Sequence, residues 1–327
     1  MNKKCLLRTP LSDKSLQKIC NIMQDRCELI IRNGEKYTPA PFTDDELETE
    51  TAIIGNPSLN TLKKCKNLEW LQLASSGADS YANCKYIDKD KTVLTNATGA
   101  YGHAIAEYMI AGVMSFTKKF HLYRDNQSRG QWLDMGFVKT IRGSKVLVAG
   151  LGDIGGQFAE KMNALGAEIY AIKRTVTAVP DYIKSIGTLD MLDELLPQMD
   201  IIALCLPNSS QTQNIISEYQ FKLMKNDALL INVGRGNAVD TNALTYALQN
   251  KLIGGAILDV TNPEPLPSDH PLWTMENVII TPHVSGGYHA QETIDGIEAI
   301  IIENASRYVN DEPLINQVDY KTGYRKK

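Results

Sequence analysis

The sequence predicts an α/β protein of two domains, each built on a parallel sheet that is covered by helices. Short apolar runs alternate with helical stretches along the chain, which is typical of parallel sheets with helices on both faces. The 327 residues are also too many for one ordinary core and indicate about two domains.

Composition narrows the class of protein. Apolar residues make up 43% and charged residues 22% of the chain, which is globular composition. The net charge of −4 argues against nucleic acid or an anionic membrane as a partner. The apolar stretch 104–116 is too short to span a bilayer, so no membrane association is expected.

The six cysteines show no C-x-x-C spacing and no paired clusters. This pattern argues against a zinc module or a disulfide framework and favours reduced thiols, so no metal site is expected. The first residues carry no long apolar stretch of the kind found in secretory signals. We therefore expect a cytoplasmic protein.

The predicted elements fall into two series. The first hundred residues contain candidate strands at 4–8, 28–32, 51–55, 69–74 and 92–95, with helices at 12–24 and from residue 44 onward. A long apolar helix at 101–119 follows, and the basic segment 118–129 is expected to be irregular. Six further strands, at 145–149, 168–172, 200–206, 228–233, 254–260 and 277–281, alternate with helices at 154–165, 189–195, 218–224 and 240–250. Such a series predicts a doubly wound sheet with right-handed crossovers.

A last helix at 290–309 has no sheet of its own and is expected to return to the first domain. The predicted division is therefore discontinuous, with one domain formed by 1–99 and 286–327 and the other by 100–285. A ligand cleft is expected between two domains arranged in this way.

The clearest motif is a glycine-rich turn, VLVAGLGDIG at 146–155, between a buried strand and a helix. In G-x-G-x-x-G, Gly150 permits the tight turn, Gly152 admits a pyrophosphate close to the backbone, and Gly155 lets the helix pack on the strand. Asp153 and Ile154 lie between these glycines, at the start of the helix. The context predicts a dinucleotide-binding (Rossmann) domain over 100–285.

The end of the second strand of this domain indicates which dinucleotide is bound. An acid there would bind the ribose 2′-hydroxyl of NAD, but this chain has Lys173, Arg174 and Thr175. Two cations and a hydroxyl suit a 2′-phosphate. We therefore expect NADP to be preferred, with NAD possible.

Three polar segments follow the last three strands: NVGRG at 232–236, DVTNPEP at 259–265 and TPHVSGG at 281–287. They place Arg235, Glu264 and His283 at strand ends beside the dinucleotide loop. The planar fork of Arg235 suits a carboxylate or carbonyl, His283 suits proton transfer, and Glu264 suits a carboxylate that orients the histidine. Together they predict carbonyl reduction by hydride transfer.

The order and spacing of these motifs resemble the D-isomer-specific 2-hydroxyacid dehydrogenases over nearly the whole chain. The resemblance implies a smaller, flavodoxin-like α/β substrate domain, a homodimer, and reversible reduction of a 2-ketoacid to a D-2-hydroxyacid. It implies that Arg235 binds the substrate's carboxylate and carbonyl oxygen, that His283 donates the proton, and that Glu264 orients His283.

The same resemblance implies further binding residues. Substrate would contact Ser75, Ser76 and Gly77, with Arg235 and His283. The cofactor would also contact Pro207, Thr212, Val233 and Asp259.

Two alternatives stay open. A dinucleotide-binding sensor or interaction protein could keep this fold without important turnover, although such a protein has no physical need for Arg235, Glu264 and His283 together. Oxidation of formate or phosphonate could use the same motif order. Glyoxylate, hydroxypyruvate, pyruvate and branched or aromatic ketoacids all remain candidate substrates.

Overall fold

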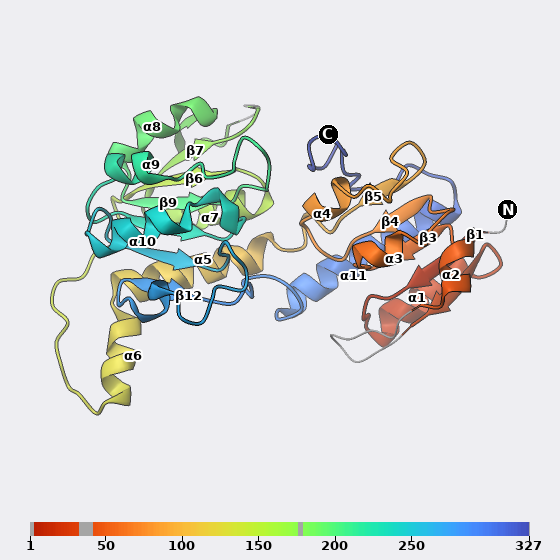
Figure 1. The fold of residues 1–327 in the computed structure, drawn as a ribbon, viewed down its shortest axis with the longest axis horizontal. Helices are drawn as coiled ribbons and strands as arrows, with labels where there is room; N and C mark the ends of the chain where they lie inside the picture. Colours follow the sequence, from red (N-terminus) through yellow and green to blue (C-terminus); the bar gives the residue numbers. More distant parts are fainter. Residues whose placement is uncertain (1–2, 33–41, 176–178, 327) are drawn as a thin grey trace. The chain divides into compact units, whose positions relative to one another are not determined.

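The computed structural model describes residues 3–32, 42–175 and 179–326, which form two compact units (Figure 1). Unit 1 is formed by Met1–Tyr101 together with Gly287–Lys327, and unit 2 is formed by Gly102–Gly286. Each unit contains one fully parallel sheet. The predicted α/β fold class is therefore confirmed.

Unit 1 has a five-stranded sheet in the order β2-β1-β3-β4-β5, which is the doubly wound order of flavodoxin-like folds. Its strands are β1 (Lys3–Leu7), β2 (Cys27–Ile31), β3 (Ala52–Ile54), β4 (Trp70–Gln72) and β5 (Val93–Thr95). Its helices are α1 (Asp13–Met23), α2 (Asp44–Thr49), α3 (Leu59–Leu62), α4 (Asp79–Ala82) and α11 (Gln291–Val309).

The two parts of unit 1 meet where α11 packs against α1. The Glu298 side chain of α11 is buried and accepts hydrogen bonds from the hydroxyls of Ser12 and Ser15, at 2.7 Å and 2.5 Å. Ser12 is also the N-cap of α1, because its hydroxyl accepts from Ser15 N. One carboxylate thus joins the start of α1 to a helix nearly 300 residues further along the chain.

Unit 2 has a seven-stranded sheet in the order β12-β11-β10-β9-β6-β7-β8. Its strands are β6 (Lys145–Ala149), β7 (Glu168–Ile172), β8 (Ile183–Gly187), β9 (Ile201–Leu204), β10 (Leu229–Asn232), β11 (Gly255–Leu258) and β12 (Val278–Ile280). Its helices are α5 (Gly102–Thr117), α6 (Phe120–Ser128), α7 (Asp153–Ala164), α8 (Leu192–Leu195), α9 (Glu218–Leu223) and α10 (Thr241–Gln249), with 3₁₀ turns at Leu189–Met191, Leu196–Gln198, Gly236–Ala238 and Pro271–Thr274.

Successive side chains of a strand lie on opposite faces of this sheet, and each face packs against a different set of helices. In β6, Leu147 and Ala149 join an apolar core with residues of α8, α9 and α10. On the other face, Val148 lies under α7, and Ile257 of β11 lies under Gly112 of α5. The sheet is therefore covered on both faces, as its near-continuous apolar strands require.

Two local predictions were wrong. The segment 118–129 is not irregular, because Phe120–Ser128 forms α6 after a left-handed turn at Lys119. Only Asn126 of this helix is buried, so the segment lacks the apolar stripe by which a helix is found in a sequence. The sheet also has seven strands rather than six, since β8 is an edge strand with only two buried residues.

Candidate active site

The carboxyl ends of the parallel strands of unit 2 carry the predicted catalytic and cofactor-binding residues. The glycine-rich turn follows β6, Lys173 follows β7, Arg235 follows β10, and the segments with Glu264 and His283 follow β11 and β12. The chain reverses its direction of strand addition between β6 and β9, which are neighbours in the sheet. Ligands of open α/β sheets bind at such a switch point, outside the carboxyl ends of the strands.

The glycines after β6 have different steric surroundings. A Cβ on Gly150 would lie 2.5 Å from Cys205 O, and a Cβ on Gly155 would meet Gly150 O and Val148. Gly150 also has φ +100°, which disfavours any larger residue. A Cβ on Gly152, in contrast, would have no neighbour within 4 Å, and Gly152 is the N-cap of α7. The turn therefore leaves open space at a helix N-terminus, which fits the phosphates of a dinucleotide.

The Asp153 side chain packs against another element of unit 2. Its carboxylate lies against Gly102, the first residue of α5, where an added Cβ would be 2.8 Å from Cγ. A carboxylate near a helix N-terminus is electrostatically favourable. Ile154, the next residue of α7, is partly buried.

The segment after β7 is held at its first residue. Lys173 N donates to Gly187 O of β8 at 2.9 Å, and the Lys173 side chain is partly buried. Arg174 and Thr175 are exposed. The acid typical of NAD-binding members of this fold is therefore replaced by a basic strand end, as the sequence indicates.

The turn after β9 is closed by its own side chains. Thr212 is buried, and its hydroxyl donates to Pro207 O at 2.7 Å and accepts from Ser209 N at 2.9 Å. Val233, after β10, is also buried, and its N–H donates to Leu204 O. Burial raises the pKa of the neighbouring Cys205 thiol to about 12, so this cysteine is not a thiolate at neutral pH.

Arg235 is held by tight backbone packing on both sides. A Cβ on Gly234 would lie 2.5 Å from Leu206 O, and one on Gly236 would strike Thr261 O. The buried Asn232 side chain accepts from Gly234 N at 3.1 Å and donates to Arg235 O at 2.9 Å. The two glycines and Asn232 fix the path of the chain at the arginine.

His283 and Glu264 are in direct contact. The imidazole Nδ1 lies 2.6 Å from Glu264 Oε1. An ionised carboxylate only accepts hydrogen bonds, so Nδ1 carries a proton and Nε2 is the nitrogen left to react. The Glu264 loop is held in turn by Thr241 and Thr261, whose hydroxyls donate to Asn262 O and Pro263 O.

The residue that organises the His283 loop is Asp259, which is 2% exposed. Its carboxylate accepts from Thr281 Oγ1 at 2.6 Å, Val284 N at 2.9 Å, and Ser285 N and Oγ at 3.0 Å and 2.5 Å. Its backbone oxygen accepts from His283 N at 2.8 Å. Asp259 is predicted to bind the cofactor, but four chain donors already fill the lone pairs of its carboxylate.

The predicted functional residues do not include Thr281, Ser285 or Tyr108. The Tyr108 hydroxyl of α5 lies 2.6 Å from Thr281 Oγ1. The available signal for Thr281 and Ser285 was the pair of hydroxyl residues that flank His283 in Thr-Pro-His-x-Ser, directly after a strand. No local pattern pointed to Tyr108.

In unit 1, the predicted substrate residues form a turn after β4. Ser75 Oγ donates to Gly77 O at 2.8 Å, and Asn96 Nδ2 donates to Ser76 O at 2.7 Å. Within the described part of the chain, the backbone N–H groups of Ser75, Ser76 and Gly77 donate to no protein acceptor. Adjacent N–H groups of this kind can bind an anion.

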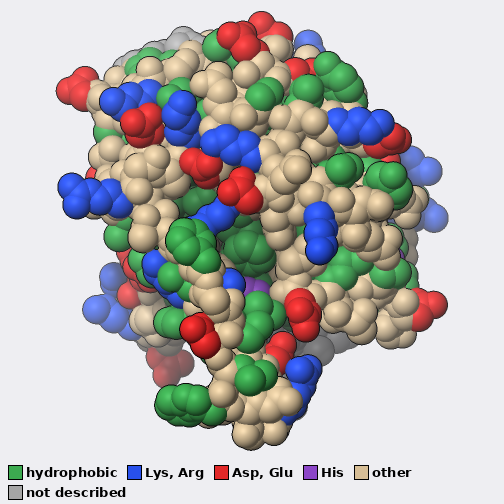
Figure 2. Space-filling view, turned by 90° about the vertical axis from the view of Figure 1, so that its left-hand side faces the viewer, with side chains coloured by type: hydrophobic (Ala, Val, Ile, Leu, Met, Phe, Trp, Pro, Cys, Tyr) green, Lys and Arg blue, Asp and Glu red, His purple; other side chains and the backbone are tan. Residues whose placement is uncertain are grey.

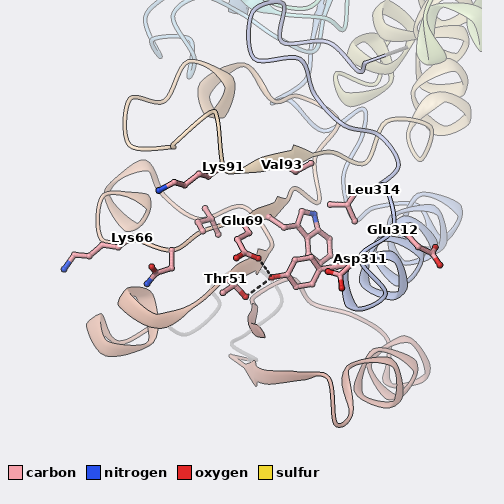
Figure 3. Close-up of a pocket in the computed structure, with 12 residues that line it drawn as sticks. Thr51, Lys66, Glu69, Lys91, Val93, Asp311, Glu312 and Leu314 are labelled. Carbon is pink, nitrogen blue, oxygen red and sulfur yellow. Dashed lines mark hydrogen bonds between the residues drawn. The ribbon is translucent and has the colours of Figure 1, made fainter. Parts of the chain in front are cut away.

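A depression of about 560 Å³ lies at the opposite, amino-terminal edge of the unit 1 sheet (Figure 3). Three of its charged side chains, Lys66, Lys91 and Asp311, form ion pairs within the chain. Its Tyr308 hydroxyl donates to Thr51 Oγ1 at 2.8 Å. None of the predicted site residues lines this depression. In the described residues no group of three His, Cys, Asp or Glu is placed to hold a metal.

The sequence of unit 2 matches a family model. Residues 110–285 match the model described as D-isomer specific 2-hydroxyacid dehydrogenase, NAD binding domain. The chain belongs to this family. It is thus an enzyme of the NAD(P)-dependent 2-hydroxyacid dehydrogenase family.

Relatives of this 2-hydroxyacid dehydrogenase extend over most of its length. A glyoxylate reductase of Thermofilum pendens is 32% identical over 277 residues, which are 81% of each chain. A glycerate dehydrogenase of Methylorubrum extorquens is 28% identical and covers 85% of this chain and 88% of its own. The crystal structure of a D-isomer specific 2-hydroxyacid dehydrogenase family protein from Aeromonas salmonicida superposes with a TM-score of 0.84 at 25% identity, covering 98% of this chain and all of that one.

The enzyme is similar in size to these relatives, and the solved structure has the same fold. Among the described residues of the dehydrogenase, no helix is long and apolar enough to cross a membrane.

Proposed function

We propose that the protein reduces a 2-ketoacid to a D-2-hydroxyacid with NAD(P)H, reversibly. The contact between His283 Nδ1 and Glu264 at 2.6 Å carries the proposal, because it prepares one imidazole nitrogen for proton transfer at the dinucleotide edge of the sheet. A sensor would not need this pair. Glyoxylate, for which one relative is named, is a 2-ketoacid, and glycerate, for which another is named, is a 2-hydroxyacid.

The cofactor would be held by Gly150, Gly152 and Gly155, with Asp153 and Ile154 at the start of α7. The open space beside Gly152 fits its phosphates. When bound, it supplies a hydride to the C2 carbonyl carbon. Pro207, Thr212, Val233 and Asp259 would shape this site, Thr212 and Asp259 through the loops that they hold.

Residues of the chain would stabilise the negative charges of the substrate and of the transition state. Arg235 binds the substrate carboxylate and stabilises the negative charge that forms on the carbonyl oxygen. His283, as imidazolium, donates the Nε2 proton to that oxygen and keeps its Nδ1 proton, which is hydrogen-bonded to Glu264. The N–H groups of Ser75, Ser76 and Gly77 would bind the substrate carboxylate.

We further propose that NADPH is preferred over NADH. Lys173, Arg174 and Thr175 follow β7, where an acid would otherwise accept the ribose hydroxyls. The 2′-phosphate of NADPH carries about −1.5 to −2 charges near neutral pH, by analogy with other phosphate monoesters.

We also propose that the protein is cytoplasmic. The six cysteines are free thiols in the structure, which supports this location.

A homodimer is proposed as well. Five hydrophobic side chains of α6 and the segment after it are exposed: Phe120 at 64%, Trp132 at 103%, Leu133 at 54%, Phe137 at 88% and Val138 at 37%. Figure 2 shows hydrophobic side chains on the lowest, projecting part of this face of unit 2. Such a surface is costly in water and suits a second copy of the chain.

The test is a panel of 2-ketoacids, from glyoxylate to aromatic ketoacids, with NADH and NADPH. Oxidation of the cofactor is followed by its absorbance. We expect turnover of at least one ketoacid. Chiral chromatography should show the D-hydroxyacid for every ketoacid that is turned over except glyoxylate, whose product is achiral. Tight cofactor binding without turnover of any ketoacid would instead favour a sensor.

A further inference from the structure

A chain of hydrogen bonds runs from helix α5 to the loop that carries His283. The Tyr108 hydroxyl lies 2.6 Å from Thr281 Oγ1, and Thr281 Oγ1 lies 2.6 Å from Asp259 Oδ1. Tyr108 and Thr281 are separated by 173 residues in the sequence, so the chain of bonds depends on the fold.

The direction of these bonds is fixed by chemistry. Thr281 Oγ1 donates to Asp259 Oδ1, so the single hydroxyl proton of Thr281 points to Asp259. Thr281 is then an acceptor for Tyr108, whose hydroxyl must donate. Burial raises the pKa of Tyr108 to about 12, so this donor keeps its proton throughout the neutral range.

Asp259 passes this constraint to His283. Its carboxylate accepts from the N–H groups of Val284 and Ser285, directly after His283, and its backbone oxygen accepts from His283 N. His283 has φ +55°, a left-handed conformation that is uncommon for a residue with a side chain. A strained residue of this kind persists only where its surroundings determine it, and here they do so through Asp259.

We propose that Tyr108 and Thr281 are positioning residues for His283, acting through the buried Asp259 carboxylate. The inference rests on the proposed function, because it concerns the proton donor of that reaction. Without the Thr281 hydroxyl, Asp259 loses one of its four donors and the His283 loop gains freedom. Nδ1 then leaves Glu264 for part of the time, and the reactive Nε2 is less often presented.

Thr281→Val removes the hydroxyl at nearly constant shape, and Thr281→Ser keeps it. We expect Thr281→Val to lower kcat for ketoacid reduction roughly 10- to 100-fold, since a bond to a charged acceptor is lost. The KM for the cofactor should stay within about twofold, and Thr281→Ser should retain kcat within about threefold. Tyr108→Phe breaks a neutral bond and should cost about 3- to 10-fold.

The double variant Tyr108→Phe/Thr281→Val tests whether the two residues act as one chain. Its kcat should lie within about twofold of Thr281→Val alone, because the second change removes a bond that is already ineffective. Multiplied effects would overturn the proposed coupling. Tyr320→Phe is the matched control, since it removes the hydroxyl of a partly buried tyrosine that donates to Thr92 O in unit 1, and it should leave kcat unchanged.

The second readout is independent of turnover. In protein labelled with ¹⁵N-histidine, neutral His283 should show the Nδ1–H tautomer, with its signal assigned by loss in His283→Asn. Thr281→Val should shift it towards a mixture of tautomers, while Tyr320→Phe should not. If the parent reduces no ketoacid, the proposed function fails and this signal still tests positioning. An active parent whose kcat and tautomer are unchanged in Thr281→Val and Tyr108→Phe would overturn the inference.

Discussion

Glu264 Oε1 lies 2.6 Å from His283 Nδ1, although the two residues follow different strands and both side chains are exposed. An exposed ion pair contributes little to stability, so the contact is better understood through proton transfer than through folding. It fixes which imidazole nitrogen is free for chemistry.

We expect His283→Asn to lower the rate of ketoacid reduction by roughly 10²–10⁴-fold, because general acid catalysis is typically worth that much. Stopped-flow and steady-state rates measure the loss. Cofactor affinity, measured by quenching of protein fluorescence, should stay near the parent value. Near-normal turnover would remove His283 from the mechanism.

Arg235→Lys keeps the positive charge and loses the planar fork. We expect kcat/KM for 2-ketoacids to fall more than tenfold, since a carboxylate and a carbonyl can no longer be held together. Arg129→Lys, on the turn after α6, is a matched control that should have no effect. Activity of the Arg235 variant within about threefold, or about 0.6 kcal/mol, would mean that Arg235 binds elsewhere.

The basic end of β7 predicts cofactor choice. We expect NADPH to be preferred over NADH by about 10- to 100-fold, a free-energy difference of about 1.4–2.8 kcal/mol. The preference should shrink as salt rises, because these charges are exposed, and shrink further in Arg174→Ala. Titration calorimetry with each cofactor measures it without turnover. Equal affinities for NADPH and NADH at low salt would contradict the proposed preference for NADPH. A higher affinity for NADH would show that the basic end of β7 does not bind the 2′-phosphate.

Glu50 predicts a pH-dependent stability. Its side chain is fully buried, neither carboxyl oxygen has a hydrogen-bond partner among the described residues, and burial raises its pKa from 4.5 to about 7. The folded state therefore binds this proton more tightly than the unfolded state. The contribution of Glu50 to the unfolding free energy is therefore greatest below about pH 4.5, falls as the pH rises to about 7, and is constant above that pH.

Glu50→Gln should abolish most of that fall. Between pH 5 and pH 8 the parent should lose roughly 2–3 kcal/mol of unfolding free energy to this group, at about 1.4 kcal/mol per unit. Urea unfolding at the two pH values measures the difference. Glu48→Gln, an exposed neighbour paired with Lys66, should leave the pH dependence as it is in the parent. If Glu50→Gln behaves in the same way, Glu50 does not titrate in this range.

The exposed segment after α6 predicts a dimer that polar substitution weakens. Trp132→Ser with Phe137→Ser should convert a particle of twice 36.3 kDa into one of 36.3 kDa by light scattering at micromolar concentration. Tyr246→Ser removes another exposed aromatic ring of unit 2 and should leave the mass unchanged. A monomeric parent would contradict the proposal at once.

Prediction of the elements from the sequence was most accurate where burial is greatest. The bounds of β6 and β7 were predicted to the residue, because central strands are continuous apolar runs between turn residues. It failed at β8 and α6, where partners in space, rather than an apolar pattern, support the element. Tyr123 of α6, for example, accepts from Met135 N of the following segment.

The candidate site shows the same division. Arg235, Glu264 and His283 were proposed from the sequence because each lies in a short motif at a strand end. Tyr108 was not, since its role depends on a contact with Thr281 across 173 residues. The sequence also gave no indication that the Asp259 carboxylate would accept four hydrogen bonds from its own chain.

The hydrogen bonds that Ser12 and Ser15 donate to Glu298 have a consequence for folding during translation. Residues 102–286 are contiguous, so this unit can fold on the ribosome as soon as it emerges. The first hundred residues emerge earlier, yet their helix α1 lacks its partner until α11 has been translated. The part of the chain that is made first is therefore completed last, and until then the α1 face that α11 will cover stays open to chaperones.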